Sequence, residues 1–466
     1  MHGEHARPKG RSWVKRRGKR HHWQRHLRTF GSLTAASQVE SALSFVTTAM
    51  LVRLFGSTET GQVLLAQSMA TVWFVLWDPR FEDALQRFVP AEQLRSPGRG
   101  TRLYCRLVRL DIVAGLLATI LGVALAVAAA TVGWISAEQL SLLVPAVMAA
   151  GAATPSGSAS AGFAIAGQLS RLGVIRLALS GVGCLVTLTA LLVTGPVGYL
   201  VATVITGLVS TVTLTVSASR QVHRVCGAPC ENSIPMPPGL LPFLVKSSAT
   251  GSVAAASDSG LSLVAGLLGG PTLVTYLKIA AAPGRLFAGF LSPVPAQLYP
   301  RLAMAGAEGR RGAVMRDVLR ASALTGGIGV IAVVTAASLL SLFLGLVYGP
   351  EYTMLSASAV VMLAGAALRG TVIWAKVLPP ALGFPGVRLI FLAVEGACQL
   401  GWLITVTQIW TGPSRMTLAF AWGSLGLLAF STIAWFVVLR FLTRSVFNSS
   451  TRAIPPRKEQ TIGIAP

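Results

Sequence analysis

Acidic residues are scarce in this 466-residue chain: 16 Asp and Glu stand against 39 Lys and Arg, and only 12% of all residues are charged. Because 53% of the residues are hydrophobic, little polar sequence remains from which to build a sizeable soluble domain. The formal net charge of +23 would suggest nucleic-acid binding in a soluble protein. Here the basic residues lie between long apolar runs, where charge sets membrane orientation, so nucleic acid is not expected as a partner.

Motifs for catalysis or cofactor binding are also lacking. No G-x4-G-K-[ST] phosphate loop occurs, and the six histidines lie in the N-terminal tail or a central loop. The five cysteines predict no disulfide framework, because none falls on the predicted outer side. His223, Cys226 and Cys230 have metal-like spacing but lack a fourth ligand, so neither a metal nor a cofactor is expected. We expect no enzyme.

Long apolar runs are abundant. Each is about 20 residues long or more, which is enough to cross the roughly 30 Å hydrocarbon core of a bilayer. They predict an all-α polytopic membrane protein with about twelve transmembrane helices in two six-helix lobes. The predicted spans are 30–52, 62–83, 108–132, 141–167, 177–194, 199–219, 240–268, 273–298, 321–346, 355–376, 387–410 and 417–440.

The charge distribution predicts orientation. With the amino terminus inside, nearly all Lys and Arg residues fall on the cytoplasmic side, whereas the outer loops keep only Arg53 and Arg415. We therefore expect a multi-pass protein of the cytoplasmic membrane with both termini cytoplasmic, in contact with membrane lipids. The predicted parts are a basic N-tail (1–29), an N-lobe (30–219), a Pro-rich connector (220–239), a C-lobe (240–440) and a C-tail (441–466).

A glycine-containing segment recurs at three predicted outer hairpins: RLFGSTETG, GLLGGPTLV and LVYGPEYTM. Gly56 and Gly269 stand at corresponding places in the two halves, as duplicated lobes require. Glycine there permits a tight reversal of the chain.

Seven charged residues fall inside predicted spans, where a lipid-exposed charge costs at least ~2.5 kcal/mol. They are Glu40, Lys246, Asp258, Lys278, Arg285, Arg369 and Glu395. In the second half, the bases outnumber the acids, which predicts a cavity that attracts an anion. Lys278 and Arg285 share one helix face, and Pro283 between them is expected to kink that helix. Buried ion pairs, Lys246 with Asp258 or Arg369 with Glu395, are the structural alternative.

Several segments together resemble a known family. They are FGSLTAASQVESALSFVTTAMLVRLFGSTETGQVLLAQSMATVWFVLWD, LQRFVPAE, FAIAGQLSRLGVIRLAL, SDSGLSLVAGLLGGPTLVTYLKIAAAPGRLF, QLYPRLAMA and LVYGPEYTMLSASAVVML. In order and spacing they are similar to bacterial polysaccharide flippases, the lipid-linked oligosaccharide exporters of the multidrug/oligosaccharidyl-lipid/polysaccharide transporter superfamily. One departure is that Asp258 is followed by Ser259 and Gly260 where relatives often carry a basic residue.

The resemblance implies two lobes around a central cavity and the flipping of undecaprenyl-pyrophosphate-linked oligosaccharide by alternating access. It implies a lipid-linked glycan as substrate, with a glycan polymerase and other envelope-synthesis proteins as partners. Arg285, Arg369, Lys278 and Lys246 are the expected substrate-binding residues, and Glu40, Asp258 and Glu395 the coupling-ion candidates. A cation-coupled multidrug exporter, a glycan polymerase and a non-transporting component of a glycan-synthesis complex are the alternatives. The short outer loops disfavour the polymerase.

Overall fold

The computed structural model describes residues 11–450 apart from 78, 97, 229–235, 309 and 383, and within them all regular elements are helices. In the first half these are α1 (Arg11–Trp77), α2 (Phe81–Arg95), α3 (Arg99–Thr131), α4 (Ala137–Ala153), α5 (Ser156–Ile165) and α6 (Leu169–Cys226). They continue with α7 (Leu240–Gly269), α8 (Pro271–Leu291), α9 (Pro293–Ala307), α10 (Arg311–Val347), η1 (Pro350–Leu355), α11 (Ser356–Thr371), η2 (Ile373–Lys376), α12 (Leu378–Ala381), α13 (Pro385–Ile409) and α14 (Pro413–Ser450). The predicted all-α class is confirmed for this part of the chain.

By length and composition, eight of the described helical segments could cross a membrane. Two of them, Gln38–Arg95 and Leu169–Cys226, are 58 residues long. At about 1.5 Å per residue, each is long enough for two crossings. Counting each as a pair, and adding α7 and the α8–α9 pair, agrees with the predicted number of about twelve. The protein is therefore a multi-pass membrane protein, whereas its orientation stays a prediction.

Glycines with positive φ mark the reversals between spans. Gly56 (φ 73°, ψ −175°) interrupts α1, and Gly195 (φ 73°, ψ −160°) interrupts α6. Both values lie in a region that almost only glycine adopts. In the second copy of the repeated motif the left-handed residue is Gly270 rather than Gly269, which ends α7, and in the third it is Gly349.

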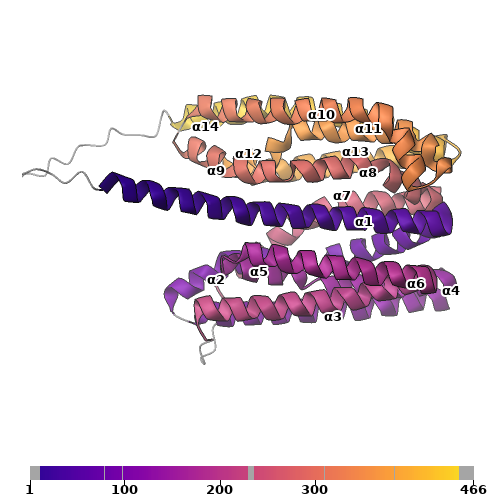
Figure 1. Cartoon of the computed structure of the whole chain (residues 1–466), viewed down its shortest axis with the longest axis horizontal. Coiled ribbons are helices and arrows are strands. Elements are labelled where there is room, and N and C mark those ends of the chain that lie inside the picture. The colour runs from indigo at the N-terminus through magenta and orange to yellow at the C-terminus, as the bar shows by residue number, and fades with distance from the viewer. Residues whose placement is uncertain are drawn as a thin grey trace, which may run out of the picture. The chain divides into compact units, whose positions relative to one another are not determined.

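The chain divides into two compact units, residues 1–263 and 264–466, so that the division falls inside α7. In the first unit, α6 packs against α1, α4 and α5, and α3 packs against α2 and α4. Figure 1 shows α3, α4, α5 and α6 running alongside one another. The predicted lobe and tail boundaries stay predictions.

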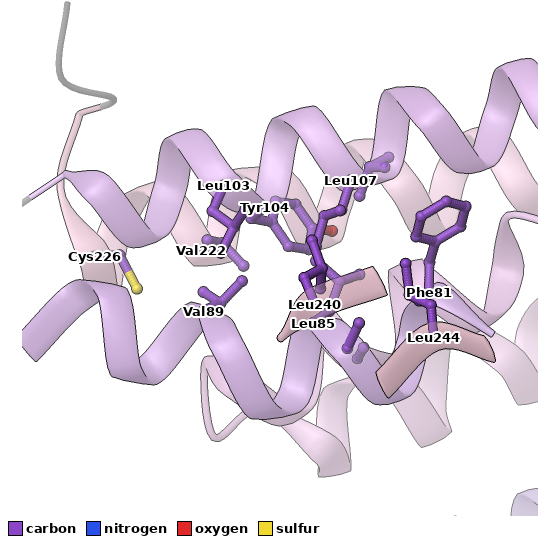
Figure 2. Close-up of a cluster of buried hydrophobic side chains, with 13 residues drawn as sticks. Phe81, Leu85, Val89, Leu103, Tyr104, Leu107, Val222, Cys226, Leu240 and Leu244 are labelled. Carbon is purple, nitrogen blue, oxygen red and sulfur yellow. The ribbon is translucent and has the colours of Figure 1, made fainter. Parts of the chain in front are cut away.

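One apolar core of the first unit explains why the start of α7 belongs to it. Leu240 and Leu244 of α7 pack with Phe81 and Leu85 of α2 and with Tyr104 of α3 (Figure 2). Tyr104 and Leu85 are fully buried there, and Leu240 is 2% exposed. Burying each such side chain contributes about 1.5–3 kcal/mol, so this core fixes α7 to the first unit.

In the second unit, α11 packs against α8, α10 and α14, and α13 packs against α14. The predicted span 273–298 falls on two helices, because α8 ends at Leu291 and α9 begins at Pro293, with Ser292 between them. Pro283 lies inside α8. The break precedes Pro293, whose ring prevents the preceding helix from continuing regularly.

Candidate functional site

A pocket of about 150 Å³ lies inside the second unit, and we call it the basic pocket. Its walls come from the end of α11, from η2, from α13 and from α14. The lining residues are Arg369, Val372, Ile373, Ala375, Lys376, Arg388, Phe391, Leu392, Glu395, Leu428, Ser431, Thr432 and Trp435. Three of them are basic and one is acidic, so the formal charge of the walls favours an anion.

Close helix packing positions Arg369. A Cβ on Gly329 of α10 would lie 2.8 Å from the Cβ of Ala367, and one on Gly284 of α8 would lie 3.2 Å from that of Ala366. Glycine at both positions therefore lets α8 and α10 approach α11. Arg369 occupies the last turn of α11, where the helix dipole favours a positive charge.

Arg369 and Glu395 form an ion pair between α11 and α13, with a guanidinium Nη2 donating to Oε1. The hydroxyl of Ser431 on α14 donates to the other carboxylate oxygen at 3.0 Å. The Glu395 side chain is 14% exposed and the Arg369 side chain is 52% exposed. The carboxylate is thus held on both oxygens, whereas about half of the Arg369 side chain is exposed.

Lys376 and Arg388 add two further positive charges. Arg388 stands in the first turn of α13, and its Nη1 donates to the backbone carbonyl of Lys376 at 3.1 Å. Lys376 lies between the candidate spans that end at Thr371 and begin at Gly386. Lys376 is exposed overall, but the protein groups around its ammonium partly desolvate it. This desolvation, followed by the positive charges of Arg369 and Arg388, lowers the pKa of Lys376.

Aromatic rings form the apolar wall of the basic pocket. The rings of Phe391 and Trp435 lie 4.2 Å apart at 33°, and Trp374 meets Trp435 edge-on at 6.2 Å. Trp374 is fully buried, and its indole N–H donates to Ser322 Oγ at 3.0 Å. This anchor holds η2, and with it Lys376, against α14 and α10. The pocket therefore combines cationic walls with an apolar one, which suits a ligand that has both characters.

The structure brings together two of the residues expected from sequence, Arg369 and Glu395. Arg285 and Lys278 on α8 do not line this pocket; Arg285 is exposed and lies near Tyr348, and Lys278 is half-buried. In the first unit, Glu40 accepts a hydrogen bond from Ser180 Oγ at 3.2 Å.

The side chains of Lys246 and Asp258 lie outside the described residues. The roles predicted for all seven charged residues stay predictions.

The sequence does not single out two basic residues of the pocket, Lys376 and Arg388. They flank a short loop, where basic residues commonly set the orientation of the protein in the membrane.

The sequence also does not single out Asp111 of α3, which lies in the first unit and stands close to the predicted start of its span. It is 3% exposed, and the fully buried Ser158 of α5 donates to its Oδ2 at 2.5 Å. Arg176 of α6 donates to Ser160 of α5 at 2.8 Å. The first unit therefore has a buried carboxylate of its own.

Neither a protein-family model nor a curated protein sequence matches the chain. Solved structures do match. A multidrug resistance MATE family transporter of the MOP superfamily, in an outward-facing conformation, is similar with a TM-score of 0.68 at 13% identity, over 90% of this chain and 96% of that chain. An inward-facing conformation of such a transporter gives a TM-score of 0.62 at 14% identity over the same shares.

A third solved structure is a MOP superfamily transporter from Pyrococcus furiosus. Its TM-score is 0.63 at 13% identity, over 90% of this chain and 96% of that chain, and reverse polarity of the binding pocket suggests a different function for that protein. At these identities the similarity establishes the fold alone. The chain has the fold of MOP superfamily transporters, as the resemblance implied, whereas membership of the polysaccharide flippase family stays a prediction.

Proposed function

We propose that this protein is a membrane transporter that flips a lipid-linked oligosaccharide and that its basic pocket binds the pyrophosphate of that lipid. The observation that carries the proposal is the convergence of Arg369, Lys376 and Arg388 on a pocket with one acid, Glu395. Arginine binds phosphate oxygens through two parallel N–H groups, and such charge-assisted hydrogen bonds are about twice as strong as neutral ones.

The position of the pocket along the membrane spans supports a lipid headgroup as ligand. Arg369 stands in the last turn of the candidate span Pro350–Thr371, and Arg388 near the start of the candidate span Gly386–Ile409. Both are therefore close to the ends at which these two candidate spans are joined. The charge distribution of the sequence assigns this end to the cytoplasmic side, where a flippase would load its substrate.

The size of the pocket limits what it holds. About 150 Å³ is below the roughly 300–1,000 Å³ of a site that encloses a whole drug-sized ligand. It suits the phosphates of a headgroup, with the glycan and the hydrocarbon chain remaining outside. The adjacent rings of Phe391 and Trp435 would contact the less polar part next to the phosphates.

Reconstituted protein tests the proposal. Proteoliposomes would receive a polyprenyl-pyrophosphate-linked oligosaccharide with a fluorescent group, and dithionite outside the vesicles would measure how much of it moves between leaflets. We expect quenching beyond the half seen in protein-free vesicles, and its loss in Arg369→Gln/Arg388→Gln. The matched control is Arg310→Gln/Arg311→Gln, which removes two basic residues of the same unit that do not line the pocket. Equal flipping by the wild type and the pocket variant would reject the proposal.

A second candidate is a cation-coupled multidrug exporter, because the similar solved structures include transporters described as multidrug resistance proteins. Glu40 and the buried Asp111 in the first unit would be available for coupling. The basic walls of the pocket argue against cationic drugs as its ligands. The same proteoliposomes loaded with ethidium under a proton or sodium gradient discriminate between the two, since ethidium movement without flipping of the lipid would favour the exporter.

A further inference from the structure

Glu395 forms an ion pair with Arg369, the residue that the proposed substrate would bind. We propose that it is an internal counter-anion, which holds Arg369 in the empty pocket, is displaced by the pyrophosphate of the substrate, and thereby sets an affinity threshold for anions. The inference rests on the proposed function, because it concerns the same pocket and the same ligand. It assigns a specificity-determining role to an acid in a site that otherwise favours anions.

The contacts of the two side chains differ in a way that a displaceable pair requires. Glu395 is held on both carboxylate oxygens, by Arg369 and by Ser431, and little of it is exposed. Arg369 has 52% of its side chain exposed and five N–H donors, of which Glu395 takes one in the geometry observed. The carboxylate is therefore the fixed partner and the guanidinium the one that is free to turn toward a ligand.

A purely structural role does not account for this asymmetric pair. Packing with other helices already holds both elements, since α11 packs against α8, α10 and α14, and α13 packs against α14. Removing the acid would leave a more strongly cationic pocket. The pair instead fits a device that makes binding to Arg369 harder, since a ligand must replace the carboxylate before it gains the arginine.

Competition by Glu395 would help the pocket to exclude ordinary phospholipids. The single phosphodiester of a phospholipid carries one negative charge and such lipids are abundant, whereas a pyrophosphate carries more charge and more oxygens. An internal carboxylate reduces the affinity of every anion, so the weaker monoanions no longer fill the pocket while the pyrophosphate still does. Building a repulsive or competing element against wrong ligands is a general route to specificity.

Binding measurements on the purified full-length chain test the inference. The probes are inorganic pyrophosphate and dimethyl phosphate, the latter a monoanionic phosphodiester, and isothermal titration calorimetry gives Kd. We expect Glu395→Gln to bind pyrophosphate at least about tenfold more tightly than the wild type and to make dimethyl phosphate binding measurable. Glu395→Asp, one carbon shorter, should give a smaller gain. The matched control is Glu308→Gln, which breaks an exposed pair with Arg310 outside the pocket and should leave Kd unchanged.

The background variant Arg369→Gln separates competition from a simple change in charge. If Glu395 acts through Arg369, Glu395→Gln gains affinity only when Arg369 is present, and a gain that persists in Arg369→Gln would overturn the inference. Pyrophosphate binding by the wild type with no gain in Glu395→Gln would also overturn it, while leaving the proposed function in place. Absence of pyrophosphate binding in the wild type and in Glu395→Gln would reject both. Thermal unfolding of each variant establishes that it is folded.

Discussion

Two glycines of α10 allow a matched test of how the second unit positions Arg369. Gly329 is buried, and a Cβ there would lie 2.8 Å from the Cβ of Ala367 and 3.3 Å from its Cα. Gly327, half a turn away, would meet nothing within 4 Å. Alanine is favoured over glycine inside a helix by about 0.5–1 kcal/mol, which Gly327→Ala should gain. Gly329→Ala should lose about 1–3 kcal/mol to overpacking, because the contact is with a methyl fixed to the backbone.

We therefore expect the two variants to differ by about 1.5–4 kcal/mol, the sum of the gain in one and the loss in the other. Thermal unfolding of the purified protein in one detergent, with both variants and the wild type side by side, measures the order of stability. Ala367 is two residues before Arg369, so Gly329→Ala should also weaken pyrophosphate binding, whereas Gly327→Ala should not. Equal melting midpoints and equal Kd for the two variants would refute the reasoning that close approach of α10 and α11 holds Arg369 in place.

Three further outcomes follow from the contacts. Pyrophosphate affinity should fall as pH rises, because Lys376 loses its proton and its positive charge. This loss should occur at a lower pH than for an ordinary lysine, since desolvation and then the two pocket arginines lower the pKa of Lys376. Calorimetry from about pH 7 to about pH 10 should show a shallower fall for Lys376→Arg, and equal falls would contradict this. Ser158→Ala should destabilise the protein by about 1.5–3 kcal/mol in thermal unfolding, because it removes a hydrogen bond to the buried carboxylate of Asp111, and an unchanged midpoint would exclude that role. Gly195→Ala should cost about 1–3 kcal/mol because of its φ of 73°, whereas Gly181→Ala, with nothing within 4 Å of the added Cβ, should not; equal midpoints would argue against backbone strain.

The helical fold and the approximate number of crossings could be predicted from sequence because the length of an apolar run has a direct physical meaning in a bilayer. The glycine motif also located the reversals at Gly56 and Gly349, although in the second copy the left-handed residue is Gly270. Helix breaks were less predictable. Pro283 is accommodated inside α8, whereas the break comes at Ser292 before Pro293. Whether a proline breaks a helix depends on whether neighbours satisfy the freed backbone groups, and the sequence of one span contains no such information.

Part of the candidate site could also be predicted from the physical properties of a bilayer. Arg369 and Glu395 stand out because a charge inside an apolar run is costly unless it meets protein or water. Their pairing across two helices could be named only as an alternative, because the sequence does not give the rotation of α11 against α13. Asp111 was missed since it lies near the predicted start of a span, where a charge is unremarkable, although the structure buries it.

The number of charges in a loop does not reveal the role of Lys376 and Arg388, the other two basic residues of the pocket. Lys376 and Arg388 are basic residues in a short loop between two spans, and such residues commonly set the orientation of a membrane protein. The sequence alone therefore favours an orienting role for them. What distinguishes them is the course of the chain after α11, where Val372 (φ −107°, ψ 25°) ends the helix and Trp374 is buried against Trp435. This contact turns η2 back toward α13, so that the carbonyl of Lys376 accepts a hydrogen bond from Arg388. Two charges that would otherwise be solvated separately thus line one pocket, and it is their convergence with Arg369, rather than their number, that favours a phosphorylated ligand.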